Sequence, residues 1–325
     1  MAGANDVTNT TSFVEATQYS QFILNQLHDG LLPDSFTRNV SDFTHGSTLN
    51  IKTIGTVTLQ DVEDNVPITY NPIDSGVVQF SLTDYVGAGW AILDTLREDG
   101  SQVEQLHAAQ AQEVTRAIQE YYETRFLAVA NAAQTAANQN VINGFDHRVQ
   151  GGGANDTVAV SDFANMRLSF DKANAPMAGR IAIVDPIVEM TLNNLVTLTT
   201  GTLDRNPKFQ GALENGFAQN HNFVMNLFGW DIWTSNRCPD ITAESLDDFA
   251  NTGAAAVTGK AAIFMCIADD NCKPIMNAWR RMPKVEAGRN KELMQDEFVE
   301  STRFGFGAQR VDTIGVVVHS ATAYV

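Results

Sequence analysis

Residues 253–260 come nearest to a known chemical motif, the loop that binds nucleotide phosphates. That motif reads G-x-x-x-x-G-K-[ST], because backbone amides surround the phosphates and the final hydroxyl binds Mg²⁺. In this chain Gly253 and Gly259 lie one residue too far apart, and Ala261 stands where the hydroxyl is needed. We therefore expect no nucleotide at this segment.

Metal ligands are the second kind of chemistry that the residues could support. None of the six histidines has the H-x-H or H-E-x-x-H spacing of a zinc site. Residues 269–272, Asp-Asp-Asn-Cys, lack the alternating spacing and the terminal Glu of a calcium loop. We expect them to form a solvated turn that caps a following helix, with Pro274 at its start, and we expect no metal or cofactor. The histidines are His28, His45, His107, His147, His221 and His319.

Arg180 and Asp185 are charged residues beside an apolar segment, a setting that could serve catalysis. Pro186 ends that segment, and Arg180 is expected to pack or pair at a domain junction. The sequence contains no G-x-S-x-G motif and no Cys–His spacing that indicates a nucleophile with its base. We predict no catalytic residue and no enzyme activity.

The charge balance argues against recognition of nucleic acid. The chain has 21 Lys and Arg against 38 Asp and Glu, a formal net charge of −17, whereas sequence-specific DNA binders show a basic face. An acidic container can still enclose DNA, because counterions screen the repulsion within about 10 Å. An aromatic cluster has no interleaved basic residue before Arg237, so it is predicted to be core and not a platform for bases. Its members are Phe217, Phe223, Phe228, Trp230 and Trp233.

Composition indicates neither export nor a membrane span. The first residues lack a basic start followed by an apolar block, so we expect no signal peptide. The longest apolar run, residues 261–268, is far shorter than the ~20 residues of a membrane span. The three cysteines, Cys238, Cys266 and Cys272, form no disulfide framework. We expect reduced, buried thiols and folding in a cytosol.

The elements that must position any functional residue begin with an arm and a hairpin. Residues 1–45 hold one short helical pattern and predict an extended arm. Residues 46–85 contain two runs of alternating apolar and polar side chains, separated by an acidic tip with two prolines at 61–72. A hairpin with so little apolar surface is marginal alone, so we expect it to lie against something else.

Residues 101–137 predict a long amphipathic helix. Eight apolar residues fall on one stripe at 100° per residue, while Gln105, Gln112, Gln119 and Glu123 fall opposite. The segment has no Pro or Gly and would span on the order of 55 Å at 1.5 Å per residue, which suits a plate-like subunit. The stripe consists of Val103, Leu106, Val114, Ala117, Ile118, Tyr121, Ala128 and Ala132.

The rest of the chain mixes helices and strands without a regular βαβ order, which predicts the α+β class. Helices are expected at 162–173, with Ser161 as its cap, and at 188–198. The length indicates about two domains, or one core with large excursions. Strands are expected at 180–184, at 223–233 with a break at Gly229, at 261–268 and at 314–318.

Five segments, in a fixed order over about residues 45–320, carry a likeness to one family. They are Leu82-Thr-Asp-Tyr85 with Trp90-Ala-Ile-Leu-Asp94, the helix at 103–133, residues 174–186, residues 228–236, and Arg303-Phe-Gly-Phe-Gly307 before the terminal strand. Together they resemble the major capsid protein family of tailed bacteriophages, with its Hong Kong 97-like fold. The third segment looks like the family's P-x-x-G-R-x-x-V-x-P segment. The fourth is similar to its G-F-D-V-Y-x-S-N segment, with Trp230, Ile232 and Trp233 as conservative replacements.

The resemblance implies a structural protein that self-assembles into an icosahedral shell around double-stranded DNA. It implies contacts with copies of itself in pentamers and hexamers, a separate scaffolding protein, a portal, and a decoration or cement protein. It also implies assembly in the host bacterial cytoplasm and a final place in the virion, without a membrane. The implied parts are an N-terminal arm at 1–45, an extended loop at 46–85, a peripheral domain at 86–186 with the spine helix, an axial domain at 187–300, and a C-terminal strand at 301–325 that returns to the peripheral domain.

Two alternatives stay open at this point. The first is the shell of a bacterial nanocompartment, the encapsulin type, which has the same fold but an enzyme cargo. The second is a soluble hydrolase whose site is dispersed in the sequence. Particles that contain DNA favour the phage interpretation, and a small discrete oligomer favours the hydrolase.

Contacts between subunits can be predicted by kind. Some members of the family join subunits by an isopeptide bond between lysine and asparagine. The hairpin has one lysine, Lys52, on its ascending strand, and no asparagine or glutamate matches that motif, so we expect a non-covalent shell. We expect ion pairs between the acidic hairpin tip and basic residues of a neighbour. The acids are Asp61, Glu63 and Asp64, and the basic candidates include Arg280, Arg281, Arg289 and Arg303.

Overall fold

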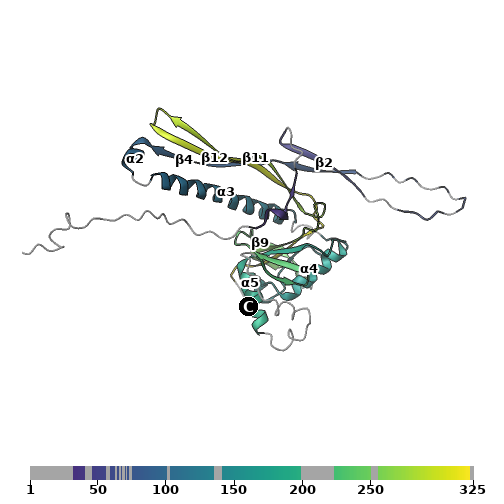
Figure 1. Cartoon of the computed structure of the whole chain (residues 1–325). Helices are drawn as coiled ribbons and strands as arrows, with labels where there is room; N and C mark the ends of the chain where they lie inside the picture. The colour runs from purple at the N-terminus through teal and green to yellow at the C-terminus, as the bar shows by residue number, and fades with distance from the viewer. Residues whose placement is uncertain are drawn as a thin grey trace, which may run out of the picture.

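The computed structural model contains two sheet-based units and a projecting hairpin (Figure 1). Helices and strands are mixed along the chain, which confirms the predicted α+β class. Predictions for residues 1–31, most of the N-terminal arm, lie outside the described residues. The structure describes residues 32–40, 46–55, 59–62, 64, 65, 67, 70, 72, 75–100, 103–134, 141–198, 223–249 and 255–322.

The first unit is a four-stranded sheet in the order β1-β11-β12-β4, with helix α3 along one face (Figure 1). Strands β11 and β12 form a long antiparallel hairpin, β4 pairs with the outer side of β12, and β1 runs parallel to β11. Helix α3 has 30 residues and is therefore about 45 Å long at 1.5 Å per residue. The elements are η1 (Asp34–Phe36), β1 (Arg38–Asn39), β4 (Asp84–Leu93), α2 (Asp94–Asp99), α3 (Val103–Ala132), β11 (Ile275–Asn290) and β12 (Gln295–Ala308).

Aromatic rings hold α3 on this sheet. Tyr122 of α3 stacks on Trp279 of β11, with ring centres 4.9 Å apart, and meets Phe304 of β12 at 5.1 Å. Trp90 of β4 donates a hydrogen bond of 3.0 Å to Nδ1 of His107 in the first turns of the helix. Each aromatic pair adds about 0.5–1.5 kcal/mol beyond its buried area, so the helix is held along much of its length.

The buried face of α3 differs from the predicted stripe. Leu106 and Tyr121 belong to that stripe but are exposed, while Phe126 and Leu127 are buried. Glu123, predicted on the polar face, is buried as well. The helix is rich in Ala and Gln, so its apolar contrast is weak, and the neighbouring sheet decides which side is covered.

The second unit is a seven-stranded sheet in the order β5-β13-β10-β6-β8-β7, with β9 also paired to β10. Strand β10 lies in its middle. The predicted strands at 180–184 and 314–318 are confirmed as β6 and as part of β13, and the strand predicted at 261–268 is confirmed up to Cys266, where β10 ends. The elements are β5 (Arg148–Gln150), η2 (Ala154–Asp156), α4 (Val160–Lys172), β6 (Arg180–Val184), α5 (Pro186–Leu198), β7 (Phe223–Leu227), β8 (Trp230–Thr234), β9 (Asp240–Leu246), β10 (Ala255–Cys266) and β13 (Ile314–Ser320).

Trp230 is the centre of the core of this unit. Its ring meets Phe170 of α4 and Phe264 of β10 edge to face, with ring centres 4.9 and 5.0 Å apart. Its Nε1 donates a hydrogen bond of 3.0 Å to the Phe163 carbonyl, so the polar atom of this buried side chain is satisfied. The prediction that this aromatic residue belongs to the core is confirmed. Within the described ranges, no helix is both long enough and apolar enough to cross a membrane.

Two local predictions are wrong. Ser161 is not the cap of α4: the helix begins at Val160, and the Asp162 carboxylate accepts a hydrogen bond of 2.8 Å from the Ala159 amide. A carboxylate satisfies the free amides of a first turn better than a hydroxyl one position earlier. Residues 269–272 do form a turn, but strand β11 follows Pro274 and not a helix, because its apolar start pairs with β12.

The two sheets do not follow the predicted domain ranges. Strand β13, within 301–325, joins β10 and β5 in the seven-stranded sheet, whereas β11 and β12 lie against α3. Residues 148–184, within the range of the predicted peripheral domain, also contribute β5, α4 and β6 to the second unit. The strands of each sheet come from segments that are far apart in the chain, so no single continuous range of residues corresponds to either unit.

Candidate functional site

The hairpin of β2 (Thr48–Ile54) and β3 (Ser75–Ser81) is the most unusual feature of the surface. Its seven residue pairs form a separate two-stranded sheet that runs away from both units (Figure 1). Leu49 and Ile51 are half-buried and alternate with exposed residues, as the period-two pattern predicts. A free two-stranded ribbon is marginal in water, so this hairpin has apolar surface to cover.

The base of the hairpin is anchored to the first unit. Phe80 and Leu82 are buried against Met276 and Ala278 of β11. The Phe80 ring also lies where a side chain at Gly307 would be, since a Cβ there would stand 2.6 Å from the ring. This close packing fixes the direction in which the hairpin leaves the sheet.

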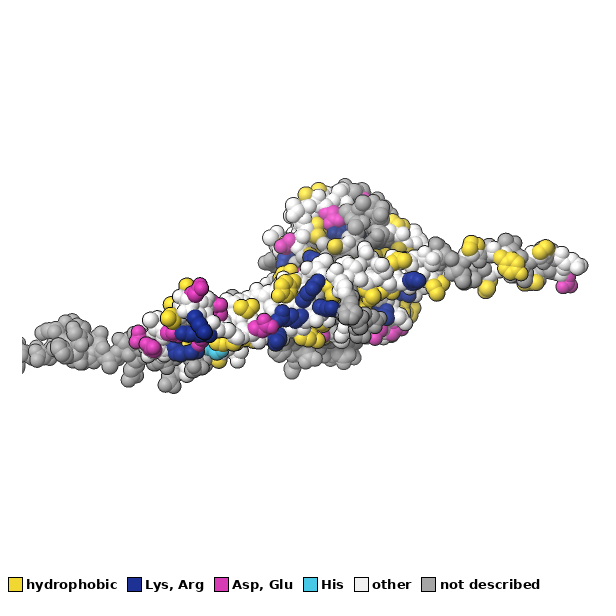
Figure 2. Space-filling view, turned by 90° about the horizontal axis from the view of Figure 1, so that it is seen from above, with side chains coloured by type: hydrophobic (Ala, Val, Ile, Leu, Met, Phe, Trp, Pro, Cys, Tyr) yellow, Lys and Arg dark blue, Asp and Glu magenta, His cyan; other side chains and the backbone are white. Residues whose placement is uncertain are grey.

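The far part of the hairpin is exposed. Leu59, Val62 and Tyr70 are 93%, 72% and 94% accessible, and Asp61 and Asp64 are exposed beside them. Figure 2 shows apolar side chains along this extension. Contiguous exposed apolar side chains mark interaction surfaces in soluble proteins.

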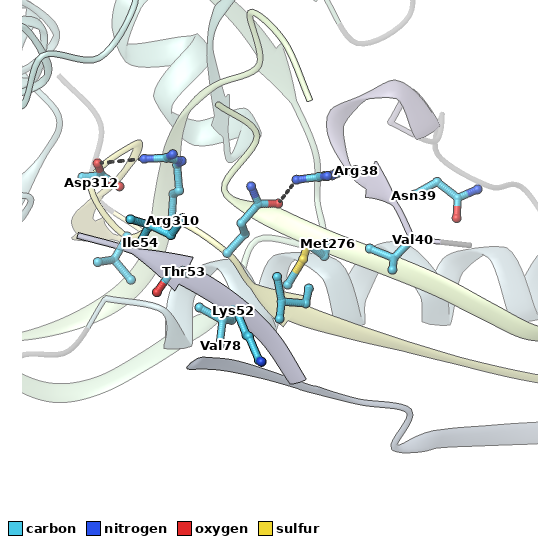
Figure 3. Close-up of a pocket in the computed structure, with 13 residues that line it drawn as sticks. Arg38, Asn39, Val40, Lys52, Thr53, Ile54, Val78, Met276, Arg310 and Asp312 are labelled. Carbon is cyan, nitrogen blue, oxygen red and sulfur yellow. Dashed lines mark hydrogen bonds and ion pairs between the residues drawn. The ribbon is translucent and has the colours of Figure 1, made fainter. Parts of the chain in front are cut away.

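A groove of about 670 Å³ lies where the hairpin leaves the body (Figure 3). Residues of β2, the segment around β1 and the loop before β13 face it. Arg38 donates a hydrogen bond of 3.1 Å to Gln309, and Arg310 pairs with Asp312 at 3.8 Å. Lys52 lies on β2 opposite Val77, on the ascending strand as predicted, and faces this groove. The lining residues are Arg38, Asn39, Val40, Ile51, Lys52, Thr53, Ile54, Val78, Met276, Gln309, Arg310, Val311 and Asp312.

The basic candidates for contacts lie in two places on the surface. Arg289 is bonded within the chain, to Asp94 at 2.5 Å and to Asp296 at 3.1 Å, and its guanidinium lowers the pKa of both carboxyl groups. A second, smaller pocket of about 440 Å³ is lined by the other three candidates. Its lining residues are Leu82, Thr83, Tyr85, Arg280, Arg281 and Arg303.

Glu123 of α3 joins three parts of the molecule, and sequence reasoning missed it. One oxygen accepts a hydrogen bond of 2.5 Å from Ser235 Oγ, at the end of β8, and the other accepts one of 3.0 Å from the Leu32 amide. Arg237 lies 3.7 Å from the same carboxylate. The root of the N-terminal segment, the long helix and the second sheet therefore meet at one buried carboxylate.

Arg180, the residue that could have suggested catalysis, has a structural role, as predicted. It is buried and donates hydrogen bonds to Asp171 at 2.6 Å and to the Pro176 carbonyl at 2.8 Å. The guanidinium also lies 5.7 Å from the centres of the Phe170 and Trp230 rings. Two further hydrogen bonds run to the Ala175 carbonyl at 2.9 Å and to the Arg167 carbonyl at 3.5 Å, so most of the N–H groups of Arg180 have partners within the chain.

The motifs for metals and nucleotides meet no matching geometry in the part of the chain that is described. Gly259 lies inside strand β10, between β9 and β13, and not in a loop. The Asp269 carboxylate accepts hydrogen bonds from the Asn271 and Cys272 amides, as a turn requires. Cys238 and Cys266 are free and buried, and burial raises the pKa of both thiols. No group of three His, Cys, Asp or Glu residues within the described ranges could hold a metal.

Some candidates lie outside the described residues: His28, His45, Glu63, Phe217, His221 and Gly253. Of the remaining histidines, His147 and His319 are buried, and Nδ1 of each lies within hydrogen-bond distance of a backbone carbonyl oxygen. The candidate site that the described residues offer is the exposed surface of the hairpin with the two pockets at its base.

Comparisons with known proteins identify the family and the fold. A family model described as "Phage capsid protein" matches residues 76–319. A search of curated proteins finds no match. Among solved structures, "Mycobacterium phage Che8" aligns over 94% of this chain and 97% of its own, with a TM-score of 0.65 and 14% identity. The capsid of cyanophage P-SCSP1u aligns over 98% and 96%, with a TM-score of 0.66 and 15% identity. The capsid of cyanophage Pam1 aligns over 99% and 100%, with a TM-score of 0.62 and 14% identity.

Proposed function

Because the chain belongs to the phage capsid protein family and has that family's shell-building role, we propose that its copies join mainly through the β2–β3 hairpin. One observation carries this proposal: the hairpin leaves its own body and keeps Leu59, Val62 and Tyr70 in solvent. A neighbouring subunit can cover that surface. Each copy then gives one hairpin and receives one, a head-to-tail contact that closes into rings.

Rings of this kind account for a durable shell built from weak contacts. Covering ~100 Å² of apolar surface stabilises a contact by about 2.5 kcal/mol at 25 cal/mol per Å². Each subunit makes several such contacts at once, and linked contacts raise the effective concentration of the next one. The rings would be the pentamers and hexamers of an icosahedral shell, with the second unit nearest their axes.

The same proposal covers the DNA that the shell encloses and the proteins that assist its assembly. The net charge of −17 suits a wall that encloses double-stranded DNA without gripping it. A scaffolding protein, a portal and a decoration or cement protein would be partners during assembly in the host cytoplasm. The bonded state of Arg180 and the turn geometry of Asp269 support a purely structural role without enzyme activity.

The two alternatives have less support. A nanocompartment shell shares the fold, but the family model that matches residues 76–319 is one of phage capsids. A hydrolase needs a nucleophile with an oriented base, and Arg180, His147 and His319 are committed to structural bonds. DNA extracted from purified particles separates the phage shell from the nanocompartment.

The proposal is tested by shortening the hairpin. Residues 55–74 are replaced by an Asn-Gly turn, which closes a two-residue hairpin without strain. We expect a subunit with an unchanged melting temperature that forms no particles by sedimentation and electron microscopy. Normal particles from this variant would contradict the proposal. Replacing only Glu292 and Leu293, in the turn between β11 and β12, by Asn-Gly is the control for altering an exposed turn.

A further inference from the structure

Arg280, Arg281 and Arg303 line one pocket on the face of the four-stranded sheet that is turned away from α3. Strand pairing places Tyr85, Arg303 and Arg281 in one row across β4, β12 and β11. Asp84 and Phe304, the chain neighbours of Tyr85 and Arg303, point toward α3: Asp84 pairs with Arg125 at 3.1 Å, and Phe304 meets Tyr122 at 5.1 Å. Successive side chains of a strand alternate between faces, so the row lies on the open face. Figure 2 views that face and shows dark blue side chains gathered on it.

The row places two positive charges directly side by side. Arg281 and Arg303 stand directly opposite each other on antiparallel strands, and like charges in that position destabilise a sheet. The pairing shifts register on both sides of Arg281, as at a β-bulge, a device that redirects side chains. Glu286 accepts a hydrogen bond of 2.5 Å from Arg281 and relieves part of the repulsion.

The pocket around this row suits an acidic ligand with apolar side chains. The six residues that line it in the described chain contain three arginines and no carboxylate, although the whole chain has a net charge of −17. Guanidinium groups bind carboxylates with two parallel hydrogen bonds. Leu82 and Tyr85 add apolar surface, and Tyr85 is 65% exposed.

Residues 55–74, the tip of the hairpin, have the complementary chemistry. They contain four acids, Asp61, Glu63, Asp64 and Asp74, and no Lys or Arg. The exposed Leu59, Val62 and Tyr70 alternate with these acids. The hairpin strands run away from the sheet of their own chain, so the tip that reaches this pocket belongs to another copy (Figure 1).

We propose that the arginine cluster of each subunit, Arg280, Arg281 and Arg303, binds the acidic hairpin tip of a neighbouring subunit. The proposal rests on the hairpin contact proposed above and names its receiving site. The carboxylates neutralise the row of arginines, while Tyr85 and Leu82 cover apolar residues of the tip. Phosphates of nucleic acid are the competing ligand, but they offer no apolar groups for this pocket and meet the repulsion of a strongly acidic chain.

The experiment reverses one charge and then restores the pair. Arg303→Glu is expected to raise the subunit concentration needed for particles by about tenfold or more, the size of one lost charge-assisted contact. Adding Asp61→Arg and Asp64→Arg to Arg303→Glu is expected to bring particles back, measured by sedimentation and electron microscopy. Lys291→Glu is the matched control, since it makes the same charge change at an exposed turn of the same sheet and is expected to assemble normally.

A second measurement covers the case in which Arg303→Glu fails to fold by thermal melting. Arg303→Cys combined with Asp64→Cys is expected to give disulfide-linked dimers and higher species on a non-reducing gel of oxidised particles. The single cysteine variants are expected to stay monomeric on the same gel. Absence of linked species in assembled particles, or failure of the charge-swapped chain to recover, overturns the proposal.

The outcomes separate this inference from the hairpin contact itself. If the shortened hairpin abolishes particles but Arg303→Glu assembles normally, the hairpin contact stands and the arginine site is wrong. If the variant with the shortened hairpin still forms particles, the proposed hairpin contact is wrong, whatever the result for Arg303→Glu. Arg303→Glu particles that form normally but contain no DNA assign the cluster to nucleic acid and also overturn the proposal.

Discussion

Arg148 of β5 and Glu244 of β9 form a two-pronged ion pair, with Nε–Oε1 and Nη2–Oε2 distances of 2.7 and 2.5 Å. Arg148 also donates hydrogen bonds to the Asn131 side chain at 2.9 Å and to the Gln134 carbonyl at 3.3 Å. Asn131 lies in the last turn of α3 and Gln134 lies two residues beyond its end, where backbone carbonyls lack partners within the helix. One buried cation therefore ties the long helix of the first unit to the sheet of the second.

Removing that cation is expected to lower the stability of the whole subunit. Arg148→Ala leaves the Glu244 carboxylate and the carbonyls at the end of α3 without their donor, and breaking a buried pair of this kind lowers the free energy of unfolding by about 3–5 kcal/mol. Urea denaturation followed by fluorescence measures the loss. Arg310→Ala, at a largely exposed arginine, is expected to stay within about 0.5 kcal/mol of the parent. Equal stability of the two variants would show that the pair is not a structural tie.

The Glu123 carboxylate is expected to hold the root of the N-terminal segment. Glu123→Ala removes the acceptor of Ser235 Oγ and of the Leu32 amide, and it should lower the free energy of unfolding by about 3 kcal/mol. Limited proteolysis should also cut near residue 32 faster than in the parent. Glu98→Ala, at an exposed glutamate of α2, is the control and should change neither measurement. An unchanged cleavage rate in Glu123→Ala would separate the segment from this carboxylate.

Asp162 is expected to make stability depend on pH. Burial raises its pKa from 3.8 to about 6, and the charge of Asp248 acts in the same direction, while hydrogen bonds from the Ala159 and Gly152 amides act against it. Because the folded state holds this proton more tightly, the ionised group lowers stability fully above about pH 6, and the penalty disappears as pH falls toward 3.8. A shift of this size corresponds to about 3 kcal/mol.

Asp162→Asn tests that dependence. Both amides bond to a single oxygen, Oδ2 of Asp162, so an amide oxygen can replace it. We expect the variant to be more stable than the parent at pH 7.5 and equal to it near pH 4, in denaturation curves at the two pH values. Asp99→Asn, at an exposed residue of α2, should show no such difference. A constant gap between Asp162→Asn and the parent at both pH values would refute the pKa assignment.

Gly259 is expected to tolerate no side chain. A Cβ there would stand 1.9 Å from the His319 carbonyl oxygen of β13, so Gly259→Ala must push apart two central strands. We expect a loss of at least about 2 kcal/mol and a lower melting temperature in calorimetry. Gly288→Ala is the matched control in strand β11, because nothing lies within 4 Å of its added Cβ. Comparable melting temperatures for the two variants would contradict the close approach of β10 and β13.

Much of the local structure could be predicted from the sequence, because it depends on neighbours a few residues away. The β-branched and apolar runs at 180–184 and 314–318 became β6 and β13. The alternation around Leu49 and Ile51 became β2, the first strand of the hairpin. The order of five family-like segments also led to the correct family. Strand β4 was missed, because Gly87 and Gly89 weaken its apolar pattern.

The contacts that hold the units together could not be predicted, because their partners are far apart in the chain. Arg148 and Glu244 are separated by 96 residues, and Glu123 and Ser235 by 112. Arg281 and Arg303 came into one row only when β11 paired with β12 in a shifted register. The amino-acid sequence by itself determined the class, most elements and the family, since periodicity and short motifs are local. Tertiary structure decided which face of α3 is buried, which sheet receives β13 and which arginines stay on the surface, since these depend on strand pairing between distant segments.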